Sequence, residues 1–368
     1  MGRTARSAYE LQDVTIVPSR RTRSSSDIST AWQIDAYRFG IPLLTQPADA
    51  IVSPTVAGAV SALGGLGVLD GEGLWARYPD PQRVIDDLLE VGAAADDSSE
   101  IIAALQKAYS APVSVDLLTE AIHTMRDAGG TVSIRLSPQN ASVLAGPAIA
   151  AGVELLVIQG TIVSAEHVQA NGTALNLKSF IADLDVPVIV GGCTNYQTAT
   201  HLMRTGAAGV IVGTGHGHTT TTDDVLGIAV PMATAIADAA AARRSYLDET
   251  GGRYVHVIAG GGIDSSADIA KAIACGADAV MLGEPLTWAV EAPADGWYWP
   301  TTAAHPVLPR GFPAPCGPAD VPLAQLLLGP ALGAQGRTNL FGALRRTMAK
   351  AGYSDLKEFQ KVGLSVHA

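Results

Sequence analysis

Residues Val210 to Thr222, which read VIVGTGHGHTTTT, join a short apolar run to a glycine-rich loop, and this junction decides the fold class. A continuous Val/Ile run of this length that ends in glycine is typical of a strand buried on both faces of a parallel sheet. Similar runs occur along the whole chain. Together they predict eight strands, at residues 41–45, 66–69, 131–136, 154–159, 187–190, 209–212, 254–259 and 279–282.

Stretches with helical periodicity separate these strands. They include residues 179–184, 196–205, 232–250 and 266–275, and residues 115–129 are interpreted as an extra helix before the third strand. Alternating strands and helices indicate a parallel sheet with crossover helices. Eight such units are accommodated most simply by a closed (β/α)8 TIM barrel of the α/β class. An open doubly wound sheet is the alternative.

The chain divides into four parts around this barrel. Residues 1–40 are polar and rich in Ser and Arg and are expected to form an N-terminal arm, whose arginines make a solvated face or, alternatively, an oligomer contact. Residues 41–284 are the expected barrel core. Residues 285–335 are rich in Pro, Gly and Trp with little periodicity, which favours a functional flap. Residues 336–368 return to helical spacing and are expected to complete the barrel as a C-terminal helical segment.

Composition limits the classes of partner. The 368 residues are 48% hydrophobic, which is ample for one large core, and the net charge is -11. A charge of this sign repels phosphate backbones at long range, so we expect no nucleic acid and no membrane among the partners. The longest apolar stretch, residues 143–158, is interrupted by Pro147, Gly152 and Glu154 and is interpreted as a helix followed by a strand.

Cysteine usage points to a reducing compartment. Cys193, Cys275 and Cys316 are far apart and form no C-x-x-C spacing, which argues against a disulfide framework or a zinc ribbon. The first residues lead into no apolar h-region, so no signal peptide is expected. The predicted location is the cytoplasm.

Two glycine-rich turns predict an anion site. Gly260, Gly261 and Gly262 follow the seventh strand, and Gly283 follows the eighth. Barrels commonly hold phosphate at this place on exposed backbone N–H groups, which a side chain would block. A purine nucleotide or a flavin could be held in this way. The alternative interpretation is tight packing of strand on helix with nothing bound.

The loop at residues 214–222 is the second candidate site. Gly215 and Gly217 would let a nucleotide lie against the backbone, while His216 and His218 alternate, so that both imidazoles could face one way as an acid/base pair or as metal ligands. We expect no metal, because no third ligand stands at a suitable spacing. Histidines with a surface or capping role, and a helix N-cap formed by residues 219–222, are the alternatives.

These motifs, taken with several others, resemble the IMP dehydrogenase/GMP reductase family. In that family the loop reads V-G-x-G-x-G-S-x-C-T-T, and the similarity extends over nearly the whole chain, through residues 9–18, 41–49, 63–69, 268–273, 342–348 and 356–360. The closest match looks like the IMP dehydrogenase-related proteins of actinobacteria, which lack the regulatory CBS pair. Residues 69–74 pass directly to the next helix and leave no room for that insertion.

The resemblance implies a chemistry and places residues in it. Family members attack C2 of a purine nucleotide with the loop cysteine and pass a hydride to or from a nicotinamide cofactor, so NAD is the cofactor implied. Here Thr220 stands at the cysteine position, followed by Thr221, and a threonine hydroxyl is barely ionised at neutral pH. His218 is the nearest base. Arg310 is the candidate for the arginine that activates water in the flap.

The same resemblance assigns the binding residues. Asp49 keeps the aspartate that follows the first strand, whereas Gly260 replaces the aspartate that grips the ribose and Glu284 replaces a serine that binds phosphate. Gln159 replaces the aspartate that faces the nicotinamide. Cys193 aligns with no nucleophile of the family, but it follows the fifth strand at the same barrel end and is the other residue expected on the cofactor side.

Because these substitutions concentrate in the pocket, the predicted function is a barrel of guanine/purine nucleotide metabolism whose cysteine-dependent oxidation of IMP is lost or weak. It would respond to a nucleotide such as IMP or GMP or bind a protein partner. Two alternatives remain open: an active NAD-dependent oxidoreductase acting on IMP or a modified purine nucleotide, and an FMN-binding barrel. The resemblance also implies a homo-oligomer, a tetramer or octamer, or an assembly with an active IMP dehydrogenase.

Overall fold

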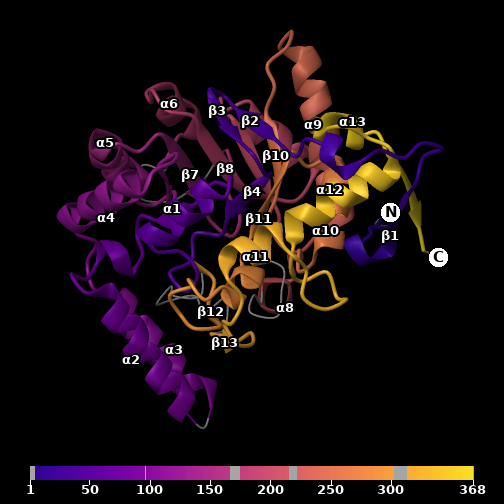
Figure 1. The fold of residues 1–368 in the computed structure, drawn as a ribbon. Helices are drawn as coiled ribbons and strands as arrows, with labels where there is room; N and C mark the ends of the chain where they lie inside the picture. Colours follow the sequence, from indigo (N-terminus) through magenta and orange to yellow (C-terminus); the bar gives the residue numbers. More distant parts are fainter. Residues whose placement is uncertain (1–4, 96, 166–174, 215–221, 302–312, 368) are drawn as a thin grey trace.

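The computed structural model describes residues 5–95, 97–165, 175–214, 222–301 and 313–367 (Figure 1). Its centre is a parallel eight-stranded sheet with strand order β4-β11-β10-β9-β8-β7-β6-β5. The strands are β4 (Leu43–Thr45), β5 (Val68–Asp70), β6 (Ser133–Leu136), β7 (Leu155–Gln159), β8 (Val188–Cys193), β9 (Gly209–Val212), β10 (His256–Ala259) and β11 (Ala279–Leu282).

One parallel bridge closes the sheet into a barrel. Leu66, just before β5, pairs with Leu44 of β4, and the Thr45 amide donates to the Leu66 carbonyl over 3.0 Å. The two end strands of the sheet therefore meet, which rules out the open doubly wound sheet. The predicted (β/α)8 barrel is confirmed.

The eight predicted strands are all present, and those at 209–212 and 279–282 have the predicted bounds. The strand predicted at 187–190 was cut short at a glycine and in fact continues to Cys193. Gly191 lies within that strand, and glycine is needed there because a Cβ would overlap Ile211 of the neighbouring strand. Here glycine allows two strands to approach each other and does not end one.

Helices follow most strands and cover the outside of the barrel. They are α1 (Pro54–Ala62), α4 (Val115–Ala128), α5 (Ala141–Ala151), α6 (Leu177–Ala182), α7 (Tyr196–Met203), α9 (Met232–Glu249), α10 (Ser266–Ala274) and α12 (Leu340–Ala351). Several begin at a Ser or Asn whose side chain accepts from a backbone N–H of the first turn, as Ser265 does from Asp268. Such caps satisfy donors that have no partner inside the helix.

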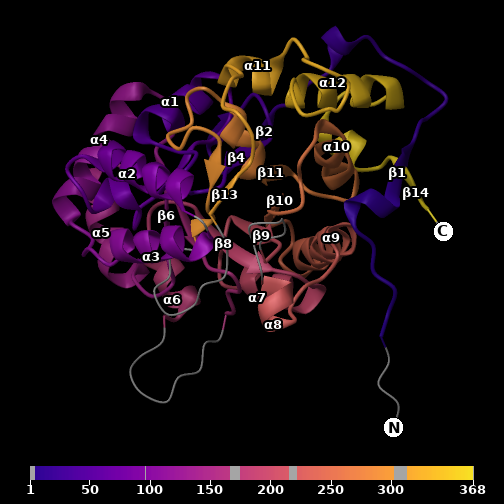
Figure 2. The same cartoon turned by 90° about the horizontal axis from the view of Figure 1, so that it is seen from below.

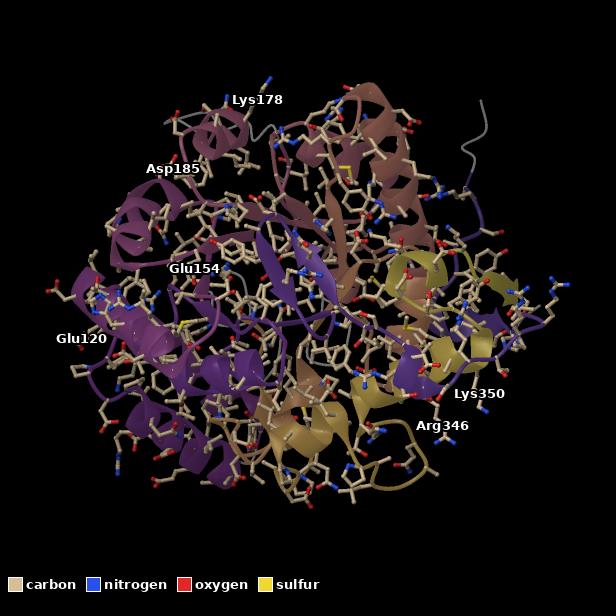
Figure 3. The ribbon with its side chains drawn as sticks, turned by 45° about the horizontal axis from the view of Figure 1, so that its top comes forward. Glu120, Glu154, Lys178, Asp185, Arg346 and Lys350 are labelled. Atoms are coloured by element: carbon tan, nitrogen blue, oxygen red, sulfur yellow. The ribbon has the colours of Figure 1, made fainter. Side chains whose placement is uncertain are left out.

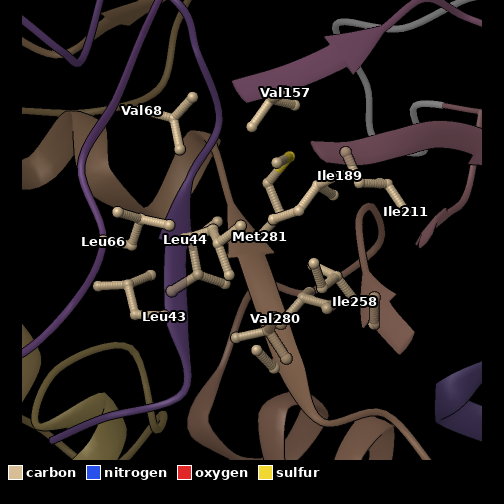
Figure 4. Packing of buried hydrophobic residues seen from close by; sticks show 14 of the residues in the cluster. Leu43, Leu44, Leu66, Val68, Val157, Ile189, Ile211, Ile258, Val280 and Met281 are labelled. Atoms are coloured by element: carbon tan, nitrogen blue, oxygen red, sulfur yellow. The ribbon is translucent and has the colours of Figure 1, made fainter. Parts of the chain in front are cut away.

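The barrel interior is filled mainly by aliphatic side chains of the strands. Figure 4 shows Leu44, Val157, Ile189 and Met281 converging on the space between the strands, and each is at most 3% exposed. Large branched residues in layers are what a closed barrel of eight strands requires. This core holds the carboxyl ends of the strands at fixed positions, and loops at that end can therefore build a site.

A helical hairpin between β5 and α4 was not predicted. It consists of α2 (Pro81–Ala94) and α3 (Ser98–Tyr109), which pack Ile85 and Leu88 against Ile101 and project from the barrel (Figures 1 and 2). Residues 115–129 were predicted to be an extra helix, and this prediction is wrong. This segment, α4, packs between α1 and α5 in the outer ring, and α2 and α3 are the additional helices.

The N-terminal segment closes the opposite end of the barrel. After the short helix η1 (Leu11–Asp13), β1 (Val14–Val17) pairs antiparallel with the C-terminal strand β14 (Gly363–Val366). Following η2 (Ser25–Asp27), the hairpin of β2 (Trp32–Ile34) and β3 (Tyr37–Phe39) buries Trp32, whose indole donates to the Ile41 carbonyl over 3.0 Å. The first and last strands of the chain thus lie side by side (Figure 2).

Residues 285–335 contain several short elements. These are η4 (Glu284–Trp288), β12 (Trp297–Tyr298), β13 (Ala314–Pro315) and α11 (Leu323–Leu328). The remaining elements of the chain are η3 (Leu74–Ala76), α8 (Thr222–Leu226) and α13 (Leu356–Phe359). Within the described residues, no helix has both the length and the apolarity needed to cross a membrane.

A buried ion cluster ties α13 to the barrel. Asp278, just before β11, is 2% exposed and accepts from Arg243 Nη1 at 2.7 Å and from Lys357 Nζ at 2.5 Å. It also accepts from the Val257 amide and the Tyr254 hydroxyl. Burial opposes ionisation of Asp278, but the two cationic side chains outweigh it and hold its pKa below the ordinary value. The cluster stands at the amino ends of the strands, away from the loops discussed next.

Candidate functional site

A cavity opens at the carboxyl ends of the strands. Its walls come from the loops after β7, β9, β10 and β11 and from the segment after β12. The lining includes Gln46, Arg135, Gln159, Gly160, Thr161, Gly213, Thr214, Gly260, Gly261, Gly262, Asp264, Met281, Gly283, Glu284, Tyr298, Pro300 and Thr301. This is the end at which barrel enzymes place their active sites.

The glycines of the two predicted phosphate turns meet in this cavity, but packing accounts for some of them. A Cβ on Gly260 would stand 2.8 Å from the Ile211 side chain, and one on Gly283 would stand 2.5 Å from the Tyr298 hydroxyl. Gly261 and Gly262 have φ of 142° and 62°, which L side chains rarely adopt. Gly261 and Gly262 are therefore the positions of these two turns at which glycine is needed for backbone conformation.

Two carboxylates line the same cavity. Glu284 follows Gly283, and Asp264 lies just beyond Gly262, so both acidic side chains belong to the wall that carries the glycine turns. The charge of Glu284 and burial both raise the pKa of Tyr298, burial contributing more. Glu284, which stands where the resemblance implies a phosphate-binding serine, is thus an acid whose charge disfavours ionisation of Tyr298.

Among the described residues of the cavity lining, Arg135 on β6 is the cationic side chain, and three of its five N–H donors are already used. Its Nε and Nη2 donate to the Gln159 carbonyl at 3.1 and 2.7 Å, and its Nη1 donates to Asp70 Oδ1 at 3.2 Å. Glu72 lies 3.9 Å from the same nitrogen. These bonds hold the ends of the strands together and leave at most two N–H donors of the guanidinium for a ligand.

Glu72 and Asp70 respond in opposite ways to this environment. Burial favours the neutral form of both, and for Asp70 it prevails over the nearby Arg135 charge, so the pKa of Asp70 is raised. For Glu72, burial is outweighed by the Arg135 charge and by hydrogen bonds from Ser137 and Asn140, so its pKa is lowered. The cluster therefore holds one carboxylate firmly ionised beside another that resists ionisation.

Asp49 lies outside the cavity lining, behind the wall. Its Oδ2 accepts from the Leu74 amide at 2.8 Å and from the Tyr109 hydroxyl at 2.5 Å, while Oδ1 is buried with no hydrogen-bond partner among the described residues. Burial, and then the charge of Asp70, raise the pKa of Asp49 to about 7. Tyr109 in turn accepts from Trp299 Nε1 at 3.0 Å. Tyr109, the last residue of α3, therefore joins Asp49 to the segment that walls the cavity.

The side of the cavity near Gln159 carries polar atoms without partners. Gln159 Oε1 and Thr161 Oγ1 are buried and make no hydrogen bond within the described part of the chain, and Gln159 Nε2 contacts only the Met281 sulfur at 3.5 Å. Leaving such atoms unpaired costs about 1–3 kcal/mol each. A ligand that carries an amide or hydroxyl group would satisfy them.

None of the three cysteines is an activated thiol. Burial raises the pKa of Cys193 to about 12 and that of Cys275 to about 11, and burial with the Glu284 charge raises that of Cys316 to about 12. The Cys193 sulfur contacts the Ile211 carbonyl at 3.4 Å inside the barrel wall. A thiolate at neutral pH is therefore absent from all three positions.

The structure brings together only part of the set of residues predicted from sequence. Gln159, Gly260, Gly261, Gly262, Gly283 and Glu284 line one cavity, whereas Asp49 and Cys193 lie behind its wall. Gly215, Gly217, His218, Thr220, Thr221 and Arg310 fall outside the described residues. Those described contain no group of three or more His, Cys, Asp or Glu side chains that could hold a metal ion.

Sequence reasoning missed Asp70, Glu72, Tyr109 and Arg135. One signal was available, because Arg135 interrupts the apolar run 131–136, and a charged residue in a buried strand requires a partner of opposite charge. The partner could not be chosen from sequence, since Asp70 and Arg135 are 65 residues apart and meet only where β5 pairs with β6.

The chain is similar to known proteins over most or all of its length. The IMP dehydrogenase / GMP reductase domain matches residues 8–303. An uncharacterized oxidoreductase of Mycolicibacterium smegmatis is 61% identical over all 368 residues, covering 100% of this chain and 98% of that protein. An IMP dehydrogenase/GMP reductase-like protein from Corynebacterium glutamicum, known from a crystal structure, superposes with a TM-score of 0.95 at 51% identity, covering 100% of this chain and 96% of the other.

Similarity to named IMP dehydrogenases is more limited. The inosine-5'-monophosphate dehydrogenase of Pasteurella multocida is 37% identical over 159 residues, which is 42% of this chain and 31% of that enzyme.

Proposed function

Because this chain belongs to the IMP dehydrogenase/GMP reductase family, we propose that it is a nucleotide-responsive barrel of guanine/purine nucleotide metabolism in which cysteine-dependent oxidation of IMP is lost or weak. It would act in the cytoplasm, as a homo-oligomer of four or eight copies or in assembly with an active IMP dehydrogenase.

The state of the cysteines carries this proposal. The sequence has three cysteines and a threonine, Thr220, at the position of the family nucleophile. Burial raises the pKa of each of the three thiols to about 11 or 12, so none of them is activated as the thiolate that would attack C2 of the purine. Removing a covalent nucleophile costs several orders of magnitude in rate.

The cavity supports retention of a ligand. We place the nucleotide against the turn at 260–262, with Gln159 and Thr161 facing the side on which a nicotinamide would lie. The unpartnered carboxamide and hydroxyl of these two residues suit the carboxamide of NAD, which would supply a hydride acceptor. Residual oxidation, if it occurs, then depends on Thr220 and His218 and not on a thiol.

The first experiment is calorimetric titration with IMP, GMP and inosine. Micromolar binding of IMP or GMP is expected. Inosine separates the contribution of the phosphate, since Asp264 and Glu284 line the wall that carries the glycine turns. Absence of binding to all three compounds would overturn the proposal.

The second experiment measures NADH and XMP formation from IMP. The expected rate lies orders of magnitude below an ordinary enzyme turnover of about 10 s⁻¹. A rate near that value, abolished in Thr220→Ala, would instead establish an active oxidoreductase with an unusual nucleophile. Visible absorbance of the purified protein would favour the FMN-binding alternative.

A further inference from the structure

A basic groove lies on the side of the barrel where the chain ends meet. It runs between β1 and α12, where Ile16 and Pro18 face Ala343, Arg346, Thr347 and Lys350. Arg346 and Lys350 are exposed on the outer face of α12, and Figure 3 shows them together at one margin of the molecule.

The N-terminal arm adds further positive charge to this groove. The Arg23 amide donates to the Ala349 carbonyl at 2.9 Å and its Nε donates to the Gly352 carbonyl at 2.8 Å, so the arm crosses the C-terminal end of α12. Arg20, Arg21 and Arg345 are exposed beside it.

Together with Arg346 and Lys350, these residues gather six of the 24 lysines and arginines of an acidic chain. Within the described residues, none of the six has a carboxylate within 4.0 Å.

The projecting α2–α3 hairpin has the opposite charge. Between residues 81 and 109 the sequence has two basic residues and six acidic ones, Asp86, Asp87, Glu90, Asp96, Asp97 and Glu100. Those that the structure describes are exposed, as are the methyl groups of Ala93 and Ala94 near the tip. The hairpin therefore presents carboxylates around a small apolar end.

The hairpin and the groove of one molecule stand at opposite ends of it. In Figure 1 the helices α2 and α3 project at the lower left while β1 and α12 lie at the right, and Figure 2 separates them in the same way. The hairpin is anchored to its own barrel, since Tyr109 bonds to Asp49 and Gln82 bonds to the Pro293 carbonyl. It cannot reach its own groove.

We propose that the basic groove between β1 and α12 receives the acidic α2–α3 hairpin of a second copy of this chain. Carboxylates of the hairpin meet Arg346, Lys350 and the arm arginines, and the alanine tip rests on Ile16 and Pro18. A contact of this kind joins unlike surfaces, so a pair of copies keeps one free groove and one free hairpin for further neighbours, and the assembly closes as a ring or grows as a filament. The inference deepens the proposed homo-oligomer by naming its surfaces.

Charge reversal on each surface tests this contact. The groove variant is Arg346→Glu with Lys350→Glu, and the hairpin variant is Glu90→Lys with Glu100→Lys. Lys178→Glu is the matched control, because Lys178 is exposed and lies far from Arg346 and Lys350 in Figure 3. Mass is measured by light scattering after size exclusion, at about 0.1 M and about 1 M salt, where screening lengths are roughly 10 and 3 Å.

Wild type and the Lys178→Glu control are expected to run well above the single-chain mass of 37.8 kDa at low salt and to dissociate at high salt. Each double variant alone is expected to run as a single chain. An equal mixture of the two is expected to recover the wild-type mass, because each reversed surface then finds its complement. That recovery also shows that both variants are folded.

Three results would overturn the proposal: a single-chain wild type, a double variant that keeps the wild-type mass on its own, or a mixture that fails to recover it. Titration with IMP on the same variants keeps the two proposals apart. A variant with altered mass and unchanged IMP binding reports on the proposed interface alone. Loss of IMP binding in every sample, wild type included, would overturn the proposed nucleotide site and leave the interface untouched.

Discussion

Tyr109→Phe tests whether the α3 helix holds the wall of the cavity. The substitution removes one hydroxyl that donates to Asp49 at 2.5 Å and accepts from Trp299 Nε1 at 3.0 Å. A hydrogen bond to a carboxylate contributes about 1.5–3 kcal/mol, and a buried indole N–H left without an acceptor costs about 1–3 kcal/mol. Since Asp49 can relax by taking up a proton, we expect a total loss of about 2–5 kcal/mol.

The loss should be visible in thermal unfolding. An unfolding entropy of about 2.1 cal/mol/K per residue gives roughly 0.8 kcal/mol/K for a chain of this length, so Tm should fall by about 3–6 °C. Tyr78→Phe is the matched control at the base of the same hairpin. Its hydroxyl donates only to the neutral Ala108 carbonyl at 2.8 Å, for which about 0.5–1.5 kcal/mol is expected.

Hydrogen exchange locates the effect. Trp299 stands between Tyr298 and Pro300, which line the cavity, so weakening its anchor should open residues 293–301 locally. A loss of 2 kcal/mol or more corresponds to exchange about 30-fold faster or more in that segment. Equal Tm and equal exchange in Tyr109→Phe and Tyr78→Phe would refute the view that Tyr109 fixes this wall.

Three further substitutions test the buried charges and the helix packing. Asp49→Asn should remove a pH dependence of stability. With the pKa of Asp49 raised to about 7, the folded state binds more protons than the unfolded state between about pH 4 and pH 7. Urea unfolding should therefore show that the free energy of unfolding of the wild type falls by up to about 4 kcal/mol relative to the variant as the pH rises through this range. Asp278→Asn leaves Arg243 buried without its partner and should cost about 3–5 kcal/mol, whereas a change in Tm under about 1 °C would contradict the role of this cluster. Gly58→Ala would drive a Cβ into that of Ala128 and should cost about 1–3 kcal/mol by denaturant unfolding, and an unchanged midpoint would mean that α1 and α4 can separate freely.

The strands could be predicted because each is a local pattern. A run such as 209–212 is apolar on both faces and bounded by glycine or a turn, and burial on both faces is a property of a parallel sheet that the sequence carries by itself. The errors arose where glycine had two meanings. At Gly191 it serves close packing within β8, and the sequence alone does not distinguish that use from a strand end.

The α2–α3 hairpin escaped prediction for a different reason. Its apolar residues, such as Ile85 and Ile101, recur with helical periodicity, but the periodicity does not reveal that the two helices pack mainly against each other and project from the barrel. The role of Tyr109 could not be predicted because its hydrogen-bond partner, Asp49, is 60 residues away in the sequence.

By itself the sequence determined the barrel, the glycine turns at 260–262 and 283, and the threonine in place of the family cysteine, because each is written in consecutive residues. Only the tertiary structure decided that Asp49 bonds to Tyr109 behind the wall and does not line the cavity, that Arg135 pairs with Asp70 and Glu72, and that burial disfavours ionisation of Cys193, Cys275 and Cys316. Those are properties of distance and dielectric environment. They exist only after strands far apart in the chain have been brought together and water has been excluded from between them.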